Sequence, residues 1–419
     1  MKKRILFIMP DLPSGGAEKL LVDILRNFDH ERYAVTLLLE YRQGVYLQDI
    51  PSEVKLLTMF KASNIWLERW HRLLRMLHCY HLYHSVVHKL VLLFVLRGLE
   101  FDTIVSFMEG EAVRIHSYLM GKAKRNVSWV HIDLKTKHWT TPFFKDNKHE
   151  RTVYERMDRI IFVSEEAQRK FYELFDLPEE KGTVQYNLID RSRVKGEGER
   201  AFGERMSGVA CGQVNGERGA GNEERKRAEW PAHRSPLTES KRLSGPTICM
   251  VGRLNPQKRY DRALRVAKRL KEDGIDFTLQ ILGEGHLEAE LKEMTRNLDI
   301  EDRVEWKGFV KPPYGYMQAA DIYWNTSEAE GYPLVVCEAL CLGRPVVATA
   351  ICGTTEILAQ GAYGCLTSEE EEDIYLKMKE MLTSETQRQA YAAKALKRAE
   401  RFDVTEVMEN IYALLEGRR

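Results

Sequence analysis

Short apolar runs alternate with helical patterns over the first 190 residues of the chain. The apolar runs lie at 5–9, 35–39, 103–107, 127–130 and 160–163, and the helical patterns between them include 18–27 and 165–174. Buried apolar strands that alternate with helices are typical of a parallel sheet covered by helices on both faces. The pattern therefore predicts a first, doubly wound α/β domain over residues 1–190.

This alternation stops at residues 191–245. The stretch holds nine glycines, and its twelve Lys and Arg outnumber its eight Asp and Glu. A segment without periodicity and with few large apolar side chains does not build a core. We expect a flexible linker or insertion here, with contact to an anionic surface as the alternative.

A second α/β alternation occupies residues 246–400. Strand-like runs lie at 247–251, 277–282, 304–307, 322–325 and 346–350, with helical patterns at 261–273, 287–298 and 334–342. An amphipathic pattern at 402–416 predicts a last helix that can pack back on the first domain. Doubly wound domains bind ligands at the carboxyl ends of their strands, so we expect a ligand cleft between the two sheets.

Composition narrows the class of protein. The net charge is only +1, and no nucleic-acid partner is predicted. None of the seven cysteines belongs to a C-x-x-C pair or to a His/Cys cluster with zinc spacing, which fits buried thiols in a reducing cytosol. No run reaches the roughly 18 uninterrupted apolar residues that predict a membrane span. We therefore expect a cytoplasmic protein.

The exit from the first strand has the residues of an anion-binding turn. Gly15 and Gly16 stand directly before a predicted helix, where backbone N–H groups can approach an anion and the helix dipole favours negative charge. A plain turn is the alternative. The segment matches neither a G-x-G-x-x-G loop nor a G-x-x-x-x-G-K-[ST] loop, which argues against a dehydrogenase or an ATPase.

Two cations follow the first strand of the second domain. Arg253 and Lys258 lie five residues apart in this loop. Arginine can clamp a diphosphate with its planar fork, and lysine supplies a mobile point charge. Gly283, after the next strand, brings bare backbone to the same edge of the sheet. Ordinary surface charges on a solvated loop are the alternative, but the carboxyl end of a strand favours a ligand site.

A glutamate pair gives the strongest signal. Glu330 precedes a helix that Gly331 and Pro333 open, and Glu338 lies more than one turn inside that helix. Residues 335–340 are otherwise apolar, and a carboxylate in such surroundings is unusual unless it binds something. Two carboxylates can accept hydrogen bonds from several hydroxyls at once, as a sugar and a ribose require. A helix-start acid plus a surface acid is the alternative.

Together these motifs resemble glycosyltransferase family 4. The similar segments follow the family's order: GGAE at 15–18, GRLNPQK at 252–258, GEG at 283–285 and EGYPLVVCE at 330–338. The likeness extends over FVSE at 162–165, YNLID at 186–190, CLGRPVVAT at 341–349 and CGTTEI at 352–357. The resemblance implies a GT-B fold, in which two Rossmann-like, doubly wound α/β domains face a central cleft. The N-terminal domain would bind the acceptor and the C-terminal domain the nucleotide-sugar.

The resemblance also implies roles for matching residues. Arg253 and Lys258 match the basic pair that holds the donor diphosphate. Glu330 matches a glutamate that contacts the donor sugar, and Glu338 matches one that contacts the ribose. His131 ends a predicted strand and matches a histidine that touches the donor sugar, although a lone histidine is more often structural. Glu330, His131 and the two cations form the implied catalytic set. The implied donor site further includes Gly15, Gly16, Gly283, Gly331, Tyr332, Pro333 and Leu334.

The implied reaction is retaining transfer of a hexosyl or N-acetylhexosaminyl group from a nucleotide-sugar, with a UDP-sugar favoured. The acceptor would be a glycan or a lipid-diphosphate-linked oligosaccharide, as in surface polysaccharide synthesis. No cofactor is expected beyond the nucleotide-sugar co-substrate, and no metal, because no D-x-D motif stands at a strand end. A nucleotide-sugar epimerase of the same fold and a catalytically silent sugar-binding subunit are the alternatives.

Residues 65–99 mix Arg, Lys and His with Trp, Leu, Tyr and Phe. Basic and aromatic residues on amphipathic helices suit an anionic membrane surface. Such a contact would hold the protein peripherally on the inner face of the plasma membrane. A pair of helices packed on the first sheet is the alternative.

Overall fold

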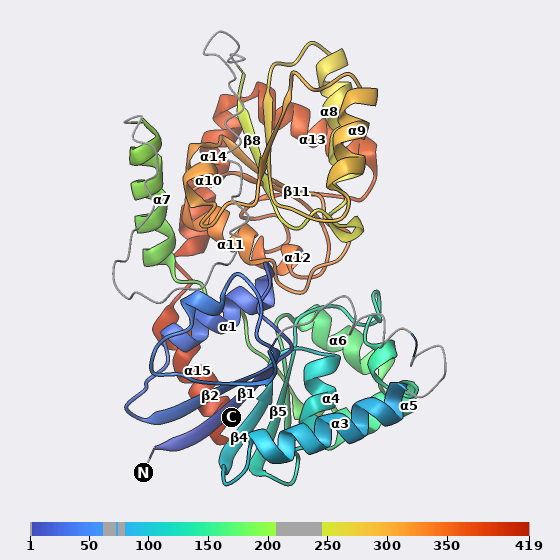
Figure 1. Ribbon diagram of the computed structural model, residues 1–419. Coiled ribbons are helices and arrows are strands. Elements are labelled where there is room, and N and C mark those ends of the chain that lie inside the picture. Colours follow the sequence, from blue (N-terminus) through green and yellow to red (C-terminus); the bar gives the residue numbers. More distant parts are fainter. Residues whose placement is uncertain (1, 62–72, 74–79, 207–244, 419) are drawn as a thin grey trace, which may run out of the picture.

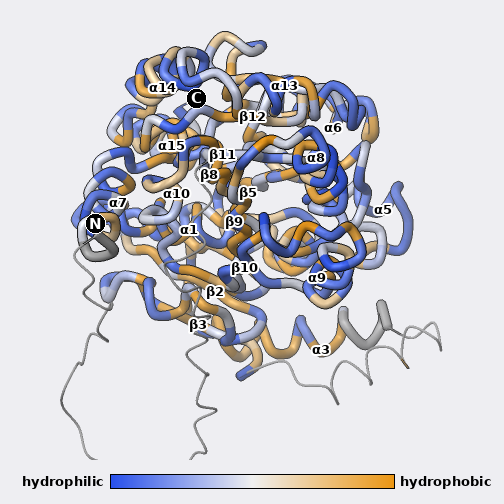
Figure 2. The backbone as a smooth tube through the Cα atoms, turned by 90° about the horizontal axis from the view of Figure 1, so that it is seen from above, coloured by the Kyte–Doolittle hydropathy of each residue, from blue (hydrophilic) through white to orange (hydrophobic). Residues whose placement is uncertain are grey.

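The protein is described here by a computed structural model, which covers residues 2–61, 73, 80–206 and 245–418 (Figure 1). It has two layered domains, one built on each of two parallel sheets. The predicted fold class, an α/β protein of two doubly wound domains, is therefore confirmed. Figure 2 shows hydrophobic segments along the central strands, among them β5 (Ala123–Val130) and β9 (Thr278–Leu282).

Within the described residues, seven parallel strands form the amino-terminal sheet. They are β1 (Lys3–Met9), β2 (Tyr33–Tyr41), β3 (Lys55–Phe60), β4 (Phe101–Ser106), β5, β6 (Arg159–Phe162) and β7 (Gly182–Val184), in the spatial order β3-β2-β1-β4-β5-β6-β7. The helices of this domain are α1 (Gly16–Arg26), α3 (Tyr80–Val95), α4 (Glu111–Ser117), α5 (Asn147–Glu155) and α6 (Glu165–Leu174). The two edge strands, β3 and β7, are only half-buried and carry no continuous apolar run that would predict them.

The described part of the second domain contains six parallel strands. They are β8 (Thr247–Val251), β9, β10 (Val304–Gly308), β11 (Ile322–Asn325), β12 (Val346–Thr349) and β13 (Cys365–Thr367), in the order β10-β9-β8-β11-β12-β13. The helices are α8 (Tyr260–Glu272), α9 (Glu288–Asn297), α10 (Tyr314–Ala319), α11 (Leu334–Cys341), α12 (Thr354–Ile357), α13 (Glu371–Thr383), α14 (Glu385–Ala399) and α15 (Val404–Glu416).

The strand order reverses at one place in each sheet. In the first sheet β1 lies between β2 and β4, and in the second β8 lies between β9 and β11. Loops that leave the two strands beside such a reversal diverge to opposite faces of the sheet and open a crevice, which is where open α/β sheets bind ligands. The topology therefore predicts that a ligand binds where the chain leaves β1, β4, β8 and β11.

The prediction of a flexible linker is wrong for the first part of residues 191–245. Residues Arg191–Met206 form a helix, α7, which packs against α10 and α11 of the second domain. Val194 is buried in this contact, and a side chain at Gly198 would overlap Leu342. The segment is mostly polar, so tertiary packing and not local periodicity determines the helix. Residues 207–244 of the predicted linker lie outside the described residues.

The last helix, α15, returns to the amino-terminal sheet (Figure 1). The ring of Tyr412 stacks on that of Tyr33 with centroids 4.9 Å apart. Thr103 Oγ1 donates a hydrogen bond to the carbonyl oxygen of Leu415 at 2.8 Å, which satisfies one of the free carbonyls at the helix end. The chain thus crosses between the domains a second time and completes the first core with its final segment. Of the helices in the described ranges, none has the length and apolarity to cross a membrane.

Replacing Tyr412 by Ala tests this docking of α15. Loss of the ring should lower the free energy of unfolding by about 3 kcal/mol, as is usual when a buried aromatic side chain is truncated. Urea unfolding followed by circular dichroism measures the change. Leu376→Ala, in α13 at a side chain that is 53% exposed, is the control and should change stability by less than about 0.5 kcal/mol. Equal losses in the two variants would contradict the docking.

Candidate active site

The predicted site residues lie on loops at the facing carboxyl edges of the two sheets. Gly15 and Gly16 follow β1, His131 follows β5, and Arg253 and Lys258 follow β8. In the same domain as the cations, Gly283 follows β9, the segment from Glu330 to Pro333 follows β11, and Leu334 and Glu338 belong to α11. Contacts between these loops bring residues of both domains together.

Arg253 reaches across the cleft. Its Nη2 donates a hydrogen bond to the backbone oxygen of Ser14 at 3.3 Å, directly before the glycine pair. The loop that carries Arg253 lies against β9, because a Cβ at Gly283 would overlap the carbonyl oxygen of Gly252. Gly283 also has a φ of 148°, a conformation that favours glycine. The arginine side chain is exposed, so its guanidinium remains available to an anion in the cleft.

Lys258 and Glu330 already form an ion pair. Lys258 ends a short 3₁₀ turn that Asn255 caps through its side chain, so the cation is held by local structure. Ser327 Oγ donates a second hydrogen bond to Glu330 Oε1 at 2.8 Å. Glu330 is 9% exposed, and its carboxylate lies between a cation and a hydroxyl.

Glu338 is buried inside α11 and is contacted from both domains. Tyr314 donates its hydroxyl to Glu338 Oε1 at 3.1 Å, and Lys19 Nζ lies 3.0 Å from the same oxygen. Lys19 belongs to α1 of the first domain. Burial lowers the pKa of Lys19, but the carboxylates of Glu338 and Asp23 outweigh it and raise the pKa well above its ordinary value. Lys19 was not predicted as a site residue.

His131 is half-buried and its imidazole is neutral. Burial lowers its pKa to about 4. Its Nε2 lies 2.9 Å from the carbonyl oxygen of Phe107, and because a carbonyl only accepts, Nε2 carries the proton and Nδ1 is the acceptor nitrogen. Its backbone N–H donates to Glu109 Oε2 at 3.0 Å. The fold therefore fixes both the position and the tautomer of this ring.

The loop after β11 touches the first domain at backbone distance. A Cβ at Gly331 would overlap the carbonyl oxygen of His131. The next residue, Tyr332, is buried against the ring of Tyr186 with centroids 5.2 Å apart, and its backbone oxygen accepts a hydrogen bond from Asn187 Nδ2 at 3.0 Å. Pro333 directly precedes α11, and Leu334 is buried in the core that both domains share. The structure thus places the Tyr332 and Leu334 side chains at the domain junction.

Three carboxyl groups of the first domain were not predicted as site residues. Asp11, Glu18 and Glu109 lie at the exits of β1 and β4, and burial is the main cause that raises the pKa of each. The pKa values of Glu18 and Glu109 rise to about 7. Glu18 folds back over the start of its own helix, since a Cβ at Gly15 would overlap its carboxylate. An acid directly after an apolar run, as in the FMEG segment, was the available sequence signal for Glu109.

A cavity of about 470 Å³ adjoins the cleft between the loops after β2 and β10. It is lined by Gly44, Val45, Leu47, Gln48, Phe309 and Lys311. Lys311 Nζ donates to the backbone oxygen of Val45 at 3.0 Å and joins the two walls. Tyr46, in the same loop, interacts electrostatically with Lys19 and Glu338. The cavity therefore lies on the side of the cleft where Glu338 lies.

Two doubly wound domains that face each other across such a cleft define the GT-B class of folds. The structure resembles that of HepE from Anabaena in complex with UDP and glucose, with a TM-score of 0.69 and 19% identity over 99% of this chain and 100% of that chain. It also resembles WaaG, a glycosyltransferase involved in lipopolysaccharide biosynthesis, with a TM-score of 0.69 and 15% identity over 99% of this chain and 100% of that chain. These likenesses establish the GT-B fold.

Residues 238–398 match the family model of glycosyl transferases group 1. A relative from Campylobacter jejuni, N-acetylgalactosamine-N,N'-diacetylbacillosaminyl-diphospho-undecaprenol 4-alpha-N-acetylgalactosaminyltransferase, is 33% identical over 177 residues, which is 42% of this chain and 48% of that protein. The amylovoran biosynthesis glycosyltransferase AmsK of Erwinia amylovora is 34% identical over 131 residues, 29% of this chain and 32% of that protein. The chain thus spans about half, or less, of the length of these relatives.

Replacing Glu109 by Gln tests the buried carboxyl behind His131. A folded-state pKa of about 7 means that the folded protein binds this proton more tightly than the unfolded chain. The contribution of this group to the free energy of unfolding is therefore fully present below the pKa that it has in the unfolded chain. The contribution is lost as pH rises through about 7. In Glu109→Gln the loss of stability between pH 5 and pH 8 should shrink by on the order of 2 kcal/mol.

Urea unfolding at a series of pH values measures this slope. Glu301→Gln, at an exposed position, is the control and should follow the wild-type profile. A profile for Glu109→Gln that parallels the wild type would show that the carboxyl does not titrate in this range.

Proposed function

We propose that the protein is a retaining glycosyltransferase that moves a sugar from a nucleotide-sugar, with a UDP-sugar favoured, to a glycan acceptor. The observation that carries the proposal is the convergence of two cations and two glutamates on one wall of the cleft with a neutral histidine on the other. Arg253, Lys258, Glu330 and Glu338 supply the first wall and His131 the second. The UDP and glucose bound to HepE, a protein of the same fold, support this choice of ligand.

The donor diphosphate would lie between Arg253, Lys258 and the start of α1. An anion at this place competes for Lys258, which is now paired with Glu330. Once the lysine turns to the diphosphate, Glu330 is free to accept hydrogen bonds from the hydroxyls of the donor sugar. Donor binding would thereby convert an internal ion pair into two ligand contacts, so that the sugar and the diphosphate are recognised together.

The nucleoside would lie on the Glu338 side of the cleft. Glu338 accepts hydrogen bonds from ribose hydroxyls in this arrangement, next to Lys19 at 3.0 Å. The adjoining cavity of about 470 Å³, with Phe309 on its wall, has room for a base, and an aromatic face can stack on it. The UDP bound to HepE supports uridine as the base, and a panel of donors tests this choice.

Transfer would proceed on one face of the sugar. The bond between the anomeric carbon and the diphosphate oxygen breaks first, and the acceptor oxygen forms the new bond on the same face while its proton passes to the leaving diphosphate. Arg253 and Lys258 stabilise the charge that develops on that diphosphate. His131 accepts a hydrogen bond from a donor hydroxyl at Nδ1. The contact between Gly331 and the His131 carbonyl holds the domains closed and limits access of water.

The acceptor would be a lipid-diphosphate-linked or other surface glycan, and the transferred group a hexosyl or N-acetylhexosaminyl unit. The name of the Campylobacter jejuni relative includes a diphospho-undecaprenol-linked acceptor, and that of the Erwinia relative names amylovoran biosynthesis. We place the reaction at the cytoplasmic face of the membrane, because nucleotide-sugars and lipid-linked glycans meet there.

Helix α3 offers a surface for that membrane. Val86, Leu90, Leu93 and Phe94 are exposed, Phe94 to 82%, and their spacing puts them on one face of the helix. Leu92 on another face is buried against the sheet. An exposed apolar helix face suits the interface of a bilayer. Part of the stretch 65–99, including Trp66, Trp70 and Arg72, lies outside the described residues.

Glu330→Gln tests the proposed donor contact. We expect kcat to fall by about 10²–10³-fold, as when a group that stabilises a transition state is removed, while the Kd for the nucleoside diphosphate stays within about threefold. Release of nucleoside diphosphate from a panel of nucleotide-sugars, with and without a lipid-linked acceptor, measures kcat, and calorimetric titration with the nucleoside diphosphate measures the Kd.

Glu328→Gln is the control, because Glu328 lies in the same loop but pairs with Arg259. Unchanged turnover in Glu330→Gln would refute the role of Glu330. Full turnover without acceptor would favour an epimerase, and binding without turnover a silent sugar-binding subunit.

Leu90→Ser combined with Phe94→Ser tests the membrane surface. The loss of two apolar side chains from an interface should weaken binding to phosphatidylglycerol vesicles by about tenfold or more, measured by co-sedimentation. Leu376→Ser, at an exposed apolar residue of α13, is the control and should bind as the wild type does. Equal sedimentation of all three proteins would exclude α3 as the contact.

A further inference from the structure

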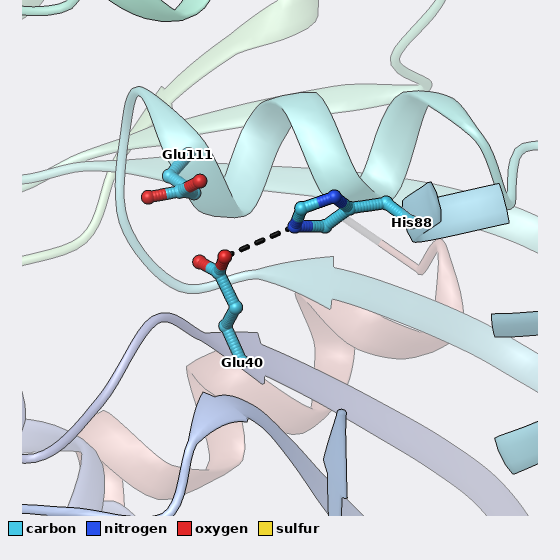
Figure 3. A group of neighbouring side chains, drawn as sticks. All are labelled: Glu40, His88 and Glu111. Atoms are coloured by element: carbon cyan, nitrogen blue, oxygen red, sulfur yellow. Dashed lines mark hydrogen bonds and ion pairs between the residues drawn. The ribbon is translucent and has the colours of Figure 1, made fainter. Parts of the chain in front are cut away.

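Three potential metal ligands meet in the first domain. Glu40 lies at the carboxyl end of β2, His88 in α3, and Glu111 at the start of α4 (Figure 3). One ligand atom from each residue lies within 4.8 Å of the other two, and among the described residues this is the group of three that does so. His88 Nε2 and Glu40 Oε1 are 3.0 Å apart.

Two of the three residues are buried, and the group has an unsatisfied acceptor. Glu40 and His88 are 1% and 2% exposed. Glu40 Oε2 is buried, and within the described part of the chain no hydrogen-bond donor meets it. A buried carboxylate oxygen without a partner is costly, and here a second carboxylate, that of Glu111, faces it (Figure 3). Two carboxylates so close together need a positive charge between them, either a cation or a shared proton.

We propose that Glu40, His88 and Glu111 bind a divalent transition-metal ion of the zinc class. An imidazole nitrogen with two carboxylate oxygens is a common ligand type for Zn²⁺, whereas Mg²⁺ and Ca²⁺ prefer oxygen ligands alone. Three protein ligands leave a fourth position for water. The ion would occupy the space that Glu40 Oε2 faces and would neutralise both carboxylates.

The role that the position indicates is structural. The three ligands come from three elements, and the ion would fasten α3 and α4 to the carboxyl end of β2. On its inner face α3 contacts the sheet through Leu92, while its outer face is exposed. A metal clamp would hold this helix in place while its apolar face engages a membrane or another partner. None of the three ligands belongs to the proposed donor site, so the metal proposal does not rest on the proposed transfer chemistry.

Titration of the metal-free full-length protein with Co²⁺ tests the proposal. Co²⁺ reports its coordination through visible absorption, and Zn²⁺ added afterwards should displace it. We expect one Co²⁺ per chain at this site. Glu111→Gln, at a partly exposed position, and His88→Gln should each weaken binding by more than about tenfold, because loss of even an outer partner of a metal site typically costs 10–100-fold.

His138→Gln is the matched control. His138 Nε2 lies 2.9 Å from Glu150 Oε2, a histidine–glutamate pair that belongs to no three-ligand group among the described residues, so this variant should bind Co²⁺ as the wild type does. Zn²⁺ should raise the melting temperature of the wild type and His138→Gln but not of Glu111→Gln. It should also slow amide exchange in α3. Circular dichroism establishes that each variant is folded.

Two results would overturn the proposal. The first is Co²⁺ binding that is absent from the wild type or equal in all variants. The second is a Glu111→Gln protein that is more stable than the metal-free wild type while Zn²⁺ stabilises neither, which would assign a shared proton to the two carboxyl groups.

Discussion

A buried ion pair between the domains, Lys19 with Glu338, is the constraint on which the closed cleft depends. The two groups lie 3.0 Å apart, one on α1 and the other on α11. A charge buried this deeply is costly unless it is paired, so the pair holds the two helices, and with them the two sheets, at one distance. Asp23 extends the pair by contacting both Lys19 and Arg193, each at 2.7 Å. Since Arg193 belongs to α7 and Tyr314 of α10 also contacts Glu338, the connecting helix joins the same network.

An element could be predicted from the sequence where local features determine it, and could not where contacts with distant segments, such as this network, hold it. Central strands are buried on both faces and appear as uninterrupted apolar runs, so they and the two doubly wound domains were predictable. Helix α7 was not, because its polar sequence is held by Arg193 and Val194 against partners far along the chain. The same holds for Lys19: a lysine on the polar side of a predicted helix has no sequence feature that reveals a buried partner 319 positions later.

The residues of the candidate site also fall into a group that could be predicted and a group that could not. Residues that sit in short motifs, such as Glu330 beside Gly331, could be named because glycine, proline and acid at fixed offsets have a local physical reason. Groups that depend on the meeting of distant segments could not. Glu40 and His88 are 48 positions apart, far outside the spacings by which metal sites are recognised in sequences, and the parallel order of β2, β1 and β4 is what brings Glu40 and Glu111 to one edge.

The closed cleft and the neutral state of His131 both depend on contacts at the domain junction. The His131 backbone is fixed by Glu109 from within its own domain and by the close approach of Gly331 from the other. Desolvation at this junction keeps the imidazole neutral, and the carbonyl of Phe107 decides which nitrogen carries the proton. A domain opening that moved Gly331 away would expose the ring to water and reduce the desolvation that keeps it neutral. In the proposed reaction, the neutral state of this acceptor and the protection of the donor from hydrolysis therefore depend on the same contact.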